Sequence, residues 1–172
     1  KIIVFGGDGF CGWPTSLKLS KEGYQVIIVD NLSRRKIDEE LGCNSLTPIF
    51  SPQERINKWN QISNSKIEFI KLDISKEFKK LVDLFVKEKP STVIHFAEQR
   101  SAPYSMKNSD NKFYTVNNNL NSTQNLLEAI VSVNQDIHLI HLGTTGYYGY
   151  SSVGLKIPEG YLPIKIDIDG EQ

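Results

Sequence analysis

The sequence has 172 residues, 39% of them hydrophobic and 23% charged, and 20 basic residues balance 20 acidic ones to a net charge of zero. This length suffices for one domain with a substantial core, and the composition argues against a disordered chain. Zero net charge disfavours a protein that coats nucleic acid. No apolar run approaches the roughly 18 residues of a membrane span. The start, Lys1–Phe5, is too short for a signal peptide, so we expect a cytoplasmic protein.

The cysteines and histidines predict neither a disulfide scaffold nor a metal site. Cys11 and Cys43 form no Cys-x-x-Cys pair, so we expect two free thiols. His95, His138 and His141 have no metal-ligand spacing with the cysteines, so we expect structural histidines and no bound metal.

Five short apolar segments predict strands that helices cover on both faces. They are Ile2–Phe5, Gln25–Val29, Ile67–Lys71, Thr92–Phe96 and His138–Leu142. Because helical patterns lie between most of them, we expect an α/β fold, a doubly wound parallel sheet of the Rossmann type with strand order 3-2-1-4-5. Residues 1–150 would form this domain, and residues 151–172 would begin a hairpin or loop that leads toward a catalytic helix and a substrate domain, with a sixth strand expected further on.

Three segments carry helix signatures. Ser51-Pro52-Gln53-Glu54 offers a cap, a first-turn proline and the acid of a capping box. A second helix, after a cap expected at Ser75, has apolar residues at helical spacing, namely Phe78, Leu81, Val82 and Phe85. A third has the same periodicity at Val116, Leu120, Leu127, Ile130 and Val131. The segment Asn31–Pro48 is long for a link between a strand and a helix, and such long links are often functional.

The first strand runs directly into a glycine turn formed by Gly6, Gly9 and Gly12, and a helix is expected to follow through about Lys21. Gly6 permits a tight turn, Gly9 lets the backbone approach a pyrophosphate, and Gly12 lets the helix pack closely on the strand. The N-terminus of the helix would present N–H groups and a partial positive charge to the phosphates. The turn therefore predicts a dinucleotide site, with a plain glycine-rich turn as the alternative.

Asp30 ends the second predicted strand, 18 residues after Gly12. A carboxylate at this place accepts hydrogen bonds from the adenosine ribose hydroxyls and repels a 2′-phosphate, which favours NAD over NADP. Arg34 and Arg35 qualify this interpretation, because a nearby arginine can serve a 2′-phosphate. The alternative is that Asp30 only caps a helix or loop.

Polar groups also follow the other strands at the edge where α/β sheets bind ligands. Asp73 and Ile74 would face the adenine, although Asp73 could instead help Ser75 to start a helix. Arg100 could bind an oxyanion with two hydrogen bonds, or be a solvated surface charge. Thr144 lies four positions before a Tyr-Gly pair and would contact the sugar hydroxyl to be oxidised, with Thr145 as the adjacent candidate.

Together these segments resemble the UDP-sulfoquinovose synthases, a family of NAD-dependent extended short-chain dehydrogenases/reductases. The resemblance is carried by Gly6–Trp13, Val29–Arg35, Ser45–Ile49 and Glu98–Met106. It implies tightly bound NAD, with UDP-glucose and sulfite or a sulfite donor as substrates. It also implies a 4-keto intermediate and UDP-6-sulfoquinovose as the product, for sulfolipid or sulfonated-glycan biosynthesis.

The resemblance also implies roles for particular residues. Those that would hold NAD are Gly6, Gly9, Phe10, Cys11, Gly12, Asp30, Asn31, Arg34, Asp73, Ile74 and Asn119. Thr144 would be catalytic and, with Arg100, would line the substrate site. Thr145 stands where the family usually has methionine.

The catalytic Tyr-x-x-x-Lys pair of the family is expected beyond Gln172, so residues 1–172 alone should be inactive. Tyr161 and Lys165 have the right spacing, but Pro163 would break the helix that aligns them. Two alternatives stay open: a generic NAD-dependent nucleotide-sugar epimerase or dehydratase, and a dinucleotide-sensing regulator without catalysis. The sequence does not identify the physiological sulfur donor or the oligomeric state. A homodimer is one of the oligomeric states that stay open.

Overall fold

A computed structural model describes residues 1–100, 102–144 and 160. The chain divides into two compact units, Lys1–Leu142 and Gly143–Gln172. The described helices and strands all belong to the first unit. None of the described helices is long and apolar enough to cross a bilayer.

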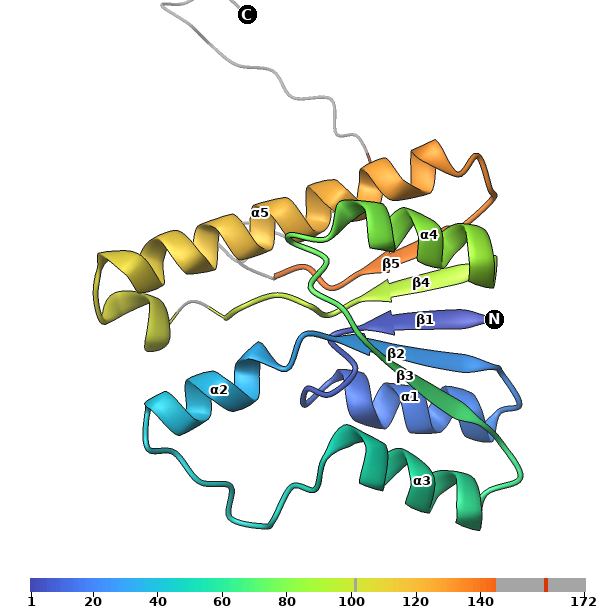
Figure 1. Ribbon diagram of the computed structural model, residues 1–172, viewed down its shortest axis with the longest axis horizontal. Helices are drawn as coiled ribbons and strands as arrows, with labels where there is room; N and C mark the ends of the chain where they lie inside the picture. Colours follow the sequence, from blue (N-terminus) through green and yellow to red (C-terminus); the bar gives the residue numbers. More distant parts are fainter. Residues whose placement is uncertain (101, 145–159, 161–172) are drawn as a thin grey trace, which may run out of the picture. The chain divides into compact units, whose positions relative to one another are not determined.

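The first unit contains a parallel sheet in the order β3-β2-β1-β4-β5, as the sequence predicts (Figure 1). Its strands are β1 (Ile2–Phe5), β2 (Val26–Asp30), β3 (Ile67–Lys71), β4 (Thr92–His95) and β5 (His138–His141). β2 begins and ends one residue later than predicted, and β4 and β5 each end one residue earlier. Phe5 is in register with Val29 on one side and with His95 on the other, so the carboxyl ends of the central strands lie at one edge.

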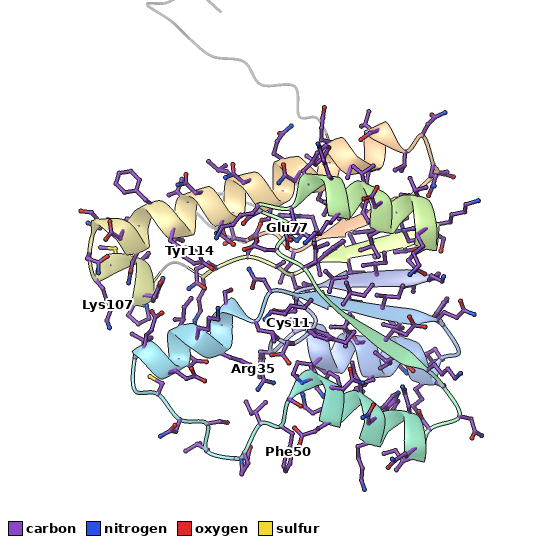
Figure 2. The ribbon with its side chains drawn as sticks, in the orientation of Figure 1. Cys11, Arg35, Phe50, Glu77, Lys107 and Tyr114 are labelled. Atoms are coloured by element: carbon purple, nitrogen blue, oxygen red, sulfur yellow. The ribbon has the colours of Figure 1, made fainter. Side chains whose placement is uncertain are left out.

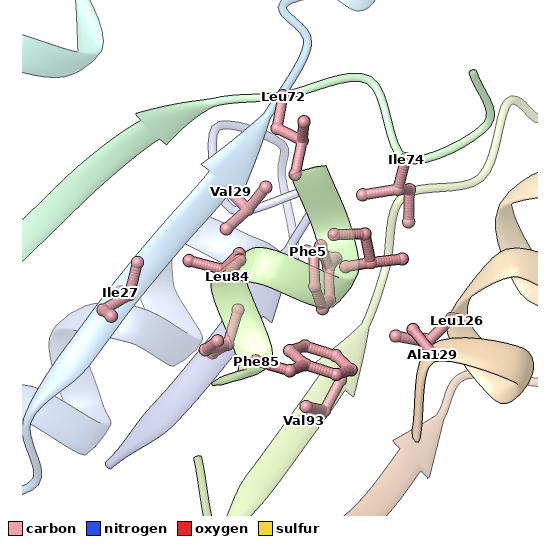
Figure 3. Close-up of a cluster of buried hydrophobic side chains, with 12 residues drawn as sticks. Phe5, Ile27, Val29, Leu72, Ile74, Leu84, Phe85, Val93, Leu126 and Ala129 are labelled. Atoms are coloured by element: carbon pink, nitrogen blue, oxygen red, sulfur yellow. The ribbon is translucent and has the colours of Figure 1, made fainter. Parts of the chain in front are cut away.

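Helices cover both faces of this sheet because alternate residues of each strand point to opposite sides. The helices are α1 (Gly12–Lys21), α2 (Ser33–Glu40), α3 (Pro52–Ile62), α4 (Phe78–Glu88) and α5 (Ser109–Ser132), with a short 3₁₀ helix η1 (Tyr104–Met106). On one face Phe5 packs against Phe85 of α4 in a T-shaped contact, with ring centroids 6.2 Å apart (Figure 3). On the other face Val4 belongs to a second cluster that contains Ile56 of α3.

The long link after β2 is not all loop. Its first part forms α2, which the sequence analysis did not predict. α2 buries only Ile37 among its eight residues, so it has no apolar periodicity from which a helix could be predicted. The capping box at the start of α3 is confirmed, because Ser51 Oγ accepts from the Glu54 N–H and Glu54 Oε2 accepts from the Ser51 N–H.

Ser75 does not cap a helix, contrary to the prediction. α4 begins at Phe78, with Glu77 at its N-cap position. Asp73 Oδ1 accepts hydrogen bonds from the Ser75 N–H at 3.1 Å and from the Ser75 hydroxyl at 2.6 Å. The Ser75 hydroxyl is thus held in a tight turn by Asp73 instead of turning toward the helix, which starts three residues later.

The predicted burial is wrong for two elements. β5 is an edge strand of the described sheet, and three of its four residues are exposed, while Leu139 packs on the core. In α5 the residues that pack on the core are Leu126, Ala129 and Ile130. Four of the five apolar residues that predict this helix are instead between 44% and 74% exposed, namely Val116, Leu120, Leu127 and Val131.

Candidate dinucleotide-binding site

The glycine turn after β1 packs so tightly that two of its positions exclude any side chain. Gly6 has φ +73°, and a Cβ there would lie 2.6 Å from the carbonyl of Phe96 after β4. A Cβ at Gly12 would lie 2.2 Å from the Gly6 carbonyl oxygen. The first turn of α1 therefore packs directly on the end of β1, the close approach predicted for Gly12.

The N-terminus of α1 has the character of an anion site. No described side chain caps its first turn, and Cys11 occupies the N-cap position without a side-chain hydrogen bond. Phe10 is 96% exposed and Cys11 is exposed, so the loop faces solvent where a ligand could bind. The main-chain N–H groups of such a turn bind phosphate groups well.

Asp30 lies beside this loop at the carboxyl end of β2. Its Oδ2 accepts from the Asp8 N–H at 3.0 Å, and its Oδ1 accepts from the Leu32 N–H at 2.8 Å. Burial raises the pKa of Asp30, while these two N–H groups oppose the shift. Each carboxylate oxygen can accept a further hydrogen bond, so Asp30 is oriented by the loop and still able to bind hydroxyl groups.

Two arginines bind the carboxylate of Asp8 in the glycine turn. The sequence analysis gives Asp8 no role. Arg35 of α2 donates to Asp8 through Nε at 2.6 Å and Nη2 at 3.0 Å, and Figure 2 labels it on the side of α2 that faces the turn. Arg55 of α3 donates to the same carboxylate and stacks on Trp13, 4.1 Å from the ring centroid. We call Asp8, Arg35 and Arg55 the Asp8 clamp.

The clamp is largely withdrawn from solvent. The side chain of Asp8 is 7% exposed and that of Arg55 16% exposed. The Asp8 carboxylate raises the pKa of Arg35, while burial lowers the pKa of Arg55. Arg34, which the resemblance assigns to NAD, pairs with Asp38 along α2 at 2.8 Å. The spacing of four residues between Arg34 and Asp38 is a sequence signal for an ion pair along a helix. With Arg34 paired in this way, Arg35 is the arginine left to contact the glycine turn.

A cavity of about 390 Å³ lies between α2, the turn after β3 and the start of α5. Asn31 and Asp73, both predicted to hold NAD, line it together with Tyr104 and Tyr114. The Tyr114 hydroxyl is buried without a hydrogen-bond partner among the described residues, and Figure 2 labels this side chain on α5. Ile74, by contrast, is 4% exposed and belongs to the core. The cavity could accept a flat polar group such as a purine.

The carboxyl ends of β4 and β5 carry a cluster of three polar side chains. Glu98 Oε1 lies 3.5 Å from His141 Nε2 and 4.0 Å from His95 Nε2, and all three groups offer ligand atoms within 4.8 Å of one another. Burial and the neighbouring His141 lower the pKa of His95 to about 4. The Ala97 N–H donates to His95 Nδ1, so the proton of this neutral ring lies on Nε2, near Thr123 Oγ1 at 3.2 Å. A protonated Nε2 is not a metal ligand, so His95 in this tautomer would not bind a metal ion.

Asn119, predicted to hold NAD, connects α5 to the loop after β4. Its Oδ1 accepts from the Gln99 N–H at 2.8 Å, and its Nδ2 donates to the Gln99 carbonyl at 2.9 Å. The buried Gln99 side chain in turn donates to the Arg100 carbonyl at 3.0 Å. This chain of contacts fixes the backbone of Arg100, whose side chain is exposed at the carboxyl edge of the sheet.

Comparison with known proteins assigns the chain to a family. Residues 2–163 match the NAD dependent epimerase/dehydratase family. The chain belongs to this family. The family's name states the cofactor of its members, and the tight turn between β1 and α1 is where a dinucleotide pyrophosphate would bind.

Individual members of the NAD dependent epimerase/dehydratase family are similar over most of the chain. A chloroplastic UDP-sulfoquinovose synthase of Spinacia oleracea is 46% identical over 95% of it, and one of Sulfolobus acidocaldarius is 42% identical over 92%. A UDP-glucose 4-epimerase of Bifidobacterium longum, solved with NAD+ and UDP, is 26% identical over 86% of the chain, with a TM-score of 0.65. The chain spans 33%, 40% and 38% of these three proteins, respectively.

The remaining predicted residues belong to the second unit, Gly143–Gln172. Thr144 is an exposed residue of the second unit. Thr145, Tyr161 and Lys165 lie outside the described residues, as does most of the predicted segment 151–172. For these positions the roles inferred from the resemblance stay predictions.

Proposed function

We propose that this chain is the NAD-binding part of a UDP-sulfoquinovose synthase, which forms UDP-6-sulfoquinovose from UDP-glucose and sulfite or a sulfite donor. The NAD part of the proposal rests on Asp30, a carboxylate held beside the glycine turn by two main-chain N–H groups. The choice of synthase over epimerase is supported by identities of 46% and 42% to two synthases, against 27%, 29% and 34% to three UDP-glucose 4-epimerases.

The residues present fit NAD. At Gly6 and Gly12 a side chain would meet backbone atoms, so the turn holds the start of α1 close to the end of β1, and the first turn of α1 offers N–H groups to the pyrophosphate. Asp30 would accept the ribose hydroxyls, and the cavity beside Asn31 and Asp73 would take the adenine. NAD, when bound, would accept a hydride from the sugar and later return it.

The substrate end would be formed by the loops after β4 and β5. Arg100, on a backbone fixed through Gln99 and Asn119, would bind an anionic part of the substrate or product. Thr144 would hydrogen-bond the sugar hydroxyl from which the proton leaves. The tyrosine of the family's Tyr-x-x-x-Lys pattern would take that proton, with its pKa lowered by the neighbouring lysine.

The test is turnover by the full-length protein with UDP-glucose and sulfite, followed by mass spectrometry of the nucleotide sugars. We expect a sulfonated product that depends on sulfite. Formation of UDP-galactose without sulfite would identify an epimerase instead. Tight NAD binding with no turnover of either kind would favour the dinucleotide-sensing regulator.

Thr144→Ala gives this assay an internal check. It should lower turnover and leave NAD affinity nearly unchanged, because the hydroxyl acts at the sugar and not at the adenosine. A Thr145→Ala enzyme that is inactive beside an active Thr144→Ala enzyme would move the role to Thr145.

A further inference from the structure

Asp8 is an unexpected residue in a phosphate-binding turn, because its negative charge opposes the binding of an anion. The structure compensates for this charge with Arg35 and Arg55. Arg35 uses the Nε and Nη2 atoms of its fork on Asp8, and its Nη2 also donates to the Phe50 carbonyl at 2.8 Å. The same paired donors would otherwise be suited to bind a phosphate group.

The clamp is joined to the residue that would read the ribose. The Asp8 N–H donates to Asp30 Oδ2, so both guanidinium groups converge on the immediate neighbour of the ribose carboxylate. Arg55 also has a buried Nε that lacks a hydrogen-bond partner among the described residues. Two arginines beside the 2′ position are the arrangement by which a Rossmann domain would accept a 2′-phosphate.

We propose that Asp8 is a specificity-determining residue that keeps the site selective for NAD, by occupying Arg35 and Arg55 so that neither can bind the 2′-phosphate of NADP. Asp30 repels that phosphate directly, and Asp8 removes the positive charge that would offset the repulsion. The inference rests on the proposed binding of NAD and adds to it the reason why two arginines beside the ribose do not invite NADP.

The experiment measures dissociation constants for NAD and for NADP by calorimetry, on the full-length protein after removal of bound dinucleotide. Asp8→Asn keeps the main-chain N–H to Asp30 and removes the charge. We expect the ratio of the NADP to the NAD dissociation constant to fall at least about tenfold, the effect of one added charge-assisted hydrogen bond. Asp8→Asn combined with Arg35→Gln should lose most of that gain.

Glu22→Gln is the matched control, because it removes a carboxylate that pairs with Lys18 on the exposed side of α1. Its ratio should equal that of the unmodified protein. If Asp8→Asn folds poorly, Asp8→Ser, with a smaller neutral side chain, takes its place and should show the same fall in the ratio. An unchanged ratio in folded Asp8 variants would overturn the inference and leave Asp8 as a support of the turn. Failure of the unmodified protein to bind either dinucleotide would instead overturn the proposed function.

Discussion

The loops at the carboxyl edge of the sheet differ in how many hydrogen bonds and buried residues hold them in place. At the end formed by β1 and β2, the Asp30 carboxylate accepts two hydrogen bonds and the Asp8 carboxylate three, and all four residues of β1 are buried. At the end formed by β4 and β5, three of the four residues of β5 are exposed, and so is the side chain of Arg100. The proposed cofactor end is therefore preset by contacts within the fold, whereas Arg100 and His141 at the proposed substrate end are exposed.

The strongest way to break the cofactor end is Gly12→Ala. Its Cβ would lie 2.2 Å from a backbone oxygen that cannot move aside, so we expect a loss of unfolding free energy at or above the roughly 1–3 kcal/mol of ordinary overpacking, together with loss of NAD binding. Denaturant unfolding and calorimetry measure both. In Gly143→Ala, where the added Cβ meets no described atom within 4 Å, both quantities should be unchanged. A stable Gly12→Ala protein that binds NAD would show that the close approach is not required.

The substrate end should respond to pH through His95, which is 1% exposed. Its folded pKa, lowered to about 4 by burial and by His141, lies below the unfolded value of about 6.5. The neutral ring therefore contributes stability above pH 6.5, and this contribution is lost as pH falls from 6.5 to about 4. The loss should be about 3 kcal/mol.

His95→Gln removes this titration, so the unfolding free energy of that variant should fall less over the same pH range than that of the unmodified protein. His138→Gln, at an exposed position of β5, is the control. Parallel pH curves for His95→Gln and the unmodified protein would contradict a buried neutral His95.

Asp30→Ala sharpens the comparison at the cofactor end. It should weaken NAD binding by about 1.5–3 kcal/mol, the value of lost charge-assisted hydrogen bonds, and narrow the preference for NAD over NADP. Calorimetry with both dinucleotides measures these effects. Asp38→Ala removes the carboxylate that pairs with Arg34 on α2. If Arg34 does not bind NAD, this variant should have unchanged NAD affinity. Unchanged affinity in Asp30→Ala would rule out its ribose role.

Arg100→Lys makes the corresponding test at the substrate end. It keeps the charge and loses the planar fork, so the KM for UDP-glucose or for sulfite should rise about fivefold, the effect of one hydrogen bond of about 1 kcal/mol. Folding and NAD affinity should not change, because the side chain is exposed. Steady-state kinetics of the full-length protein decide the matter: wild-type KM values for both substrates would make Arg100 a surface charge.

The smallest effect is expected for Ser51→Ala. Ser51 caps α3 through the Glu54 N–H at 3.2 Å, and loss of such a cap costs about 1 kcal/mol of unfolding free energy. Ser109→Ala is the matched control, because Ser109 begins α5 but Asn108 is the residue that caps it. Equal losses in the two variants would mean that the capping box contributes nothing specific to stability.

Features that depend on neighbouring residues could be predicted from the sequence. The glycine turn, the capping box at Ser51 and the strand order each follow from short patterns or from the alternation of elements. The Asp8 clamp could not, because its arginines lie 27 and 47 residues from Asp8. The buried face of α5 was also missed, since periodicity shows that a helix is amphipathic but not which side the sheet and α4 will cover.

Stacking of Arg55 on Trp13 has a spectroscopic consequence. The protein has two tryptophans, and the other, Trp59, donates from its indole N–H to Ser20 Oγ at 3.1 Å. Both indoles therefore lie between α1 and α3, on the face of the sheet away from α4 and α5. Tryptophan emission will report on that layer alone. If emission and far-ultraviolet circular dichroism trace different unfolding curves, the two layers lose structure at different points, and the cofactor end can be followed without any added label.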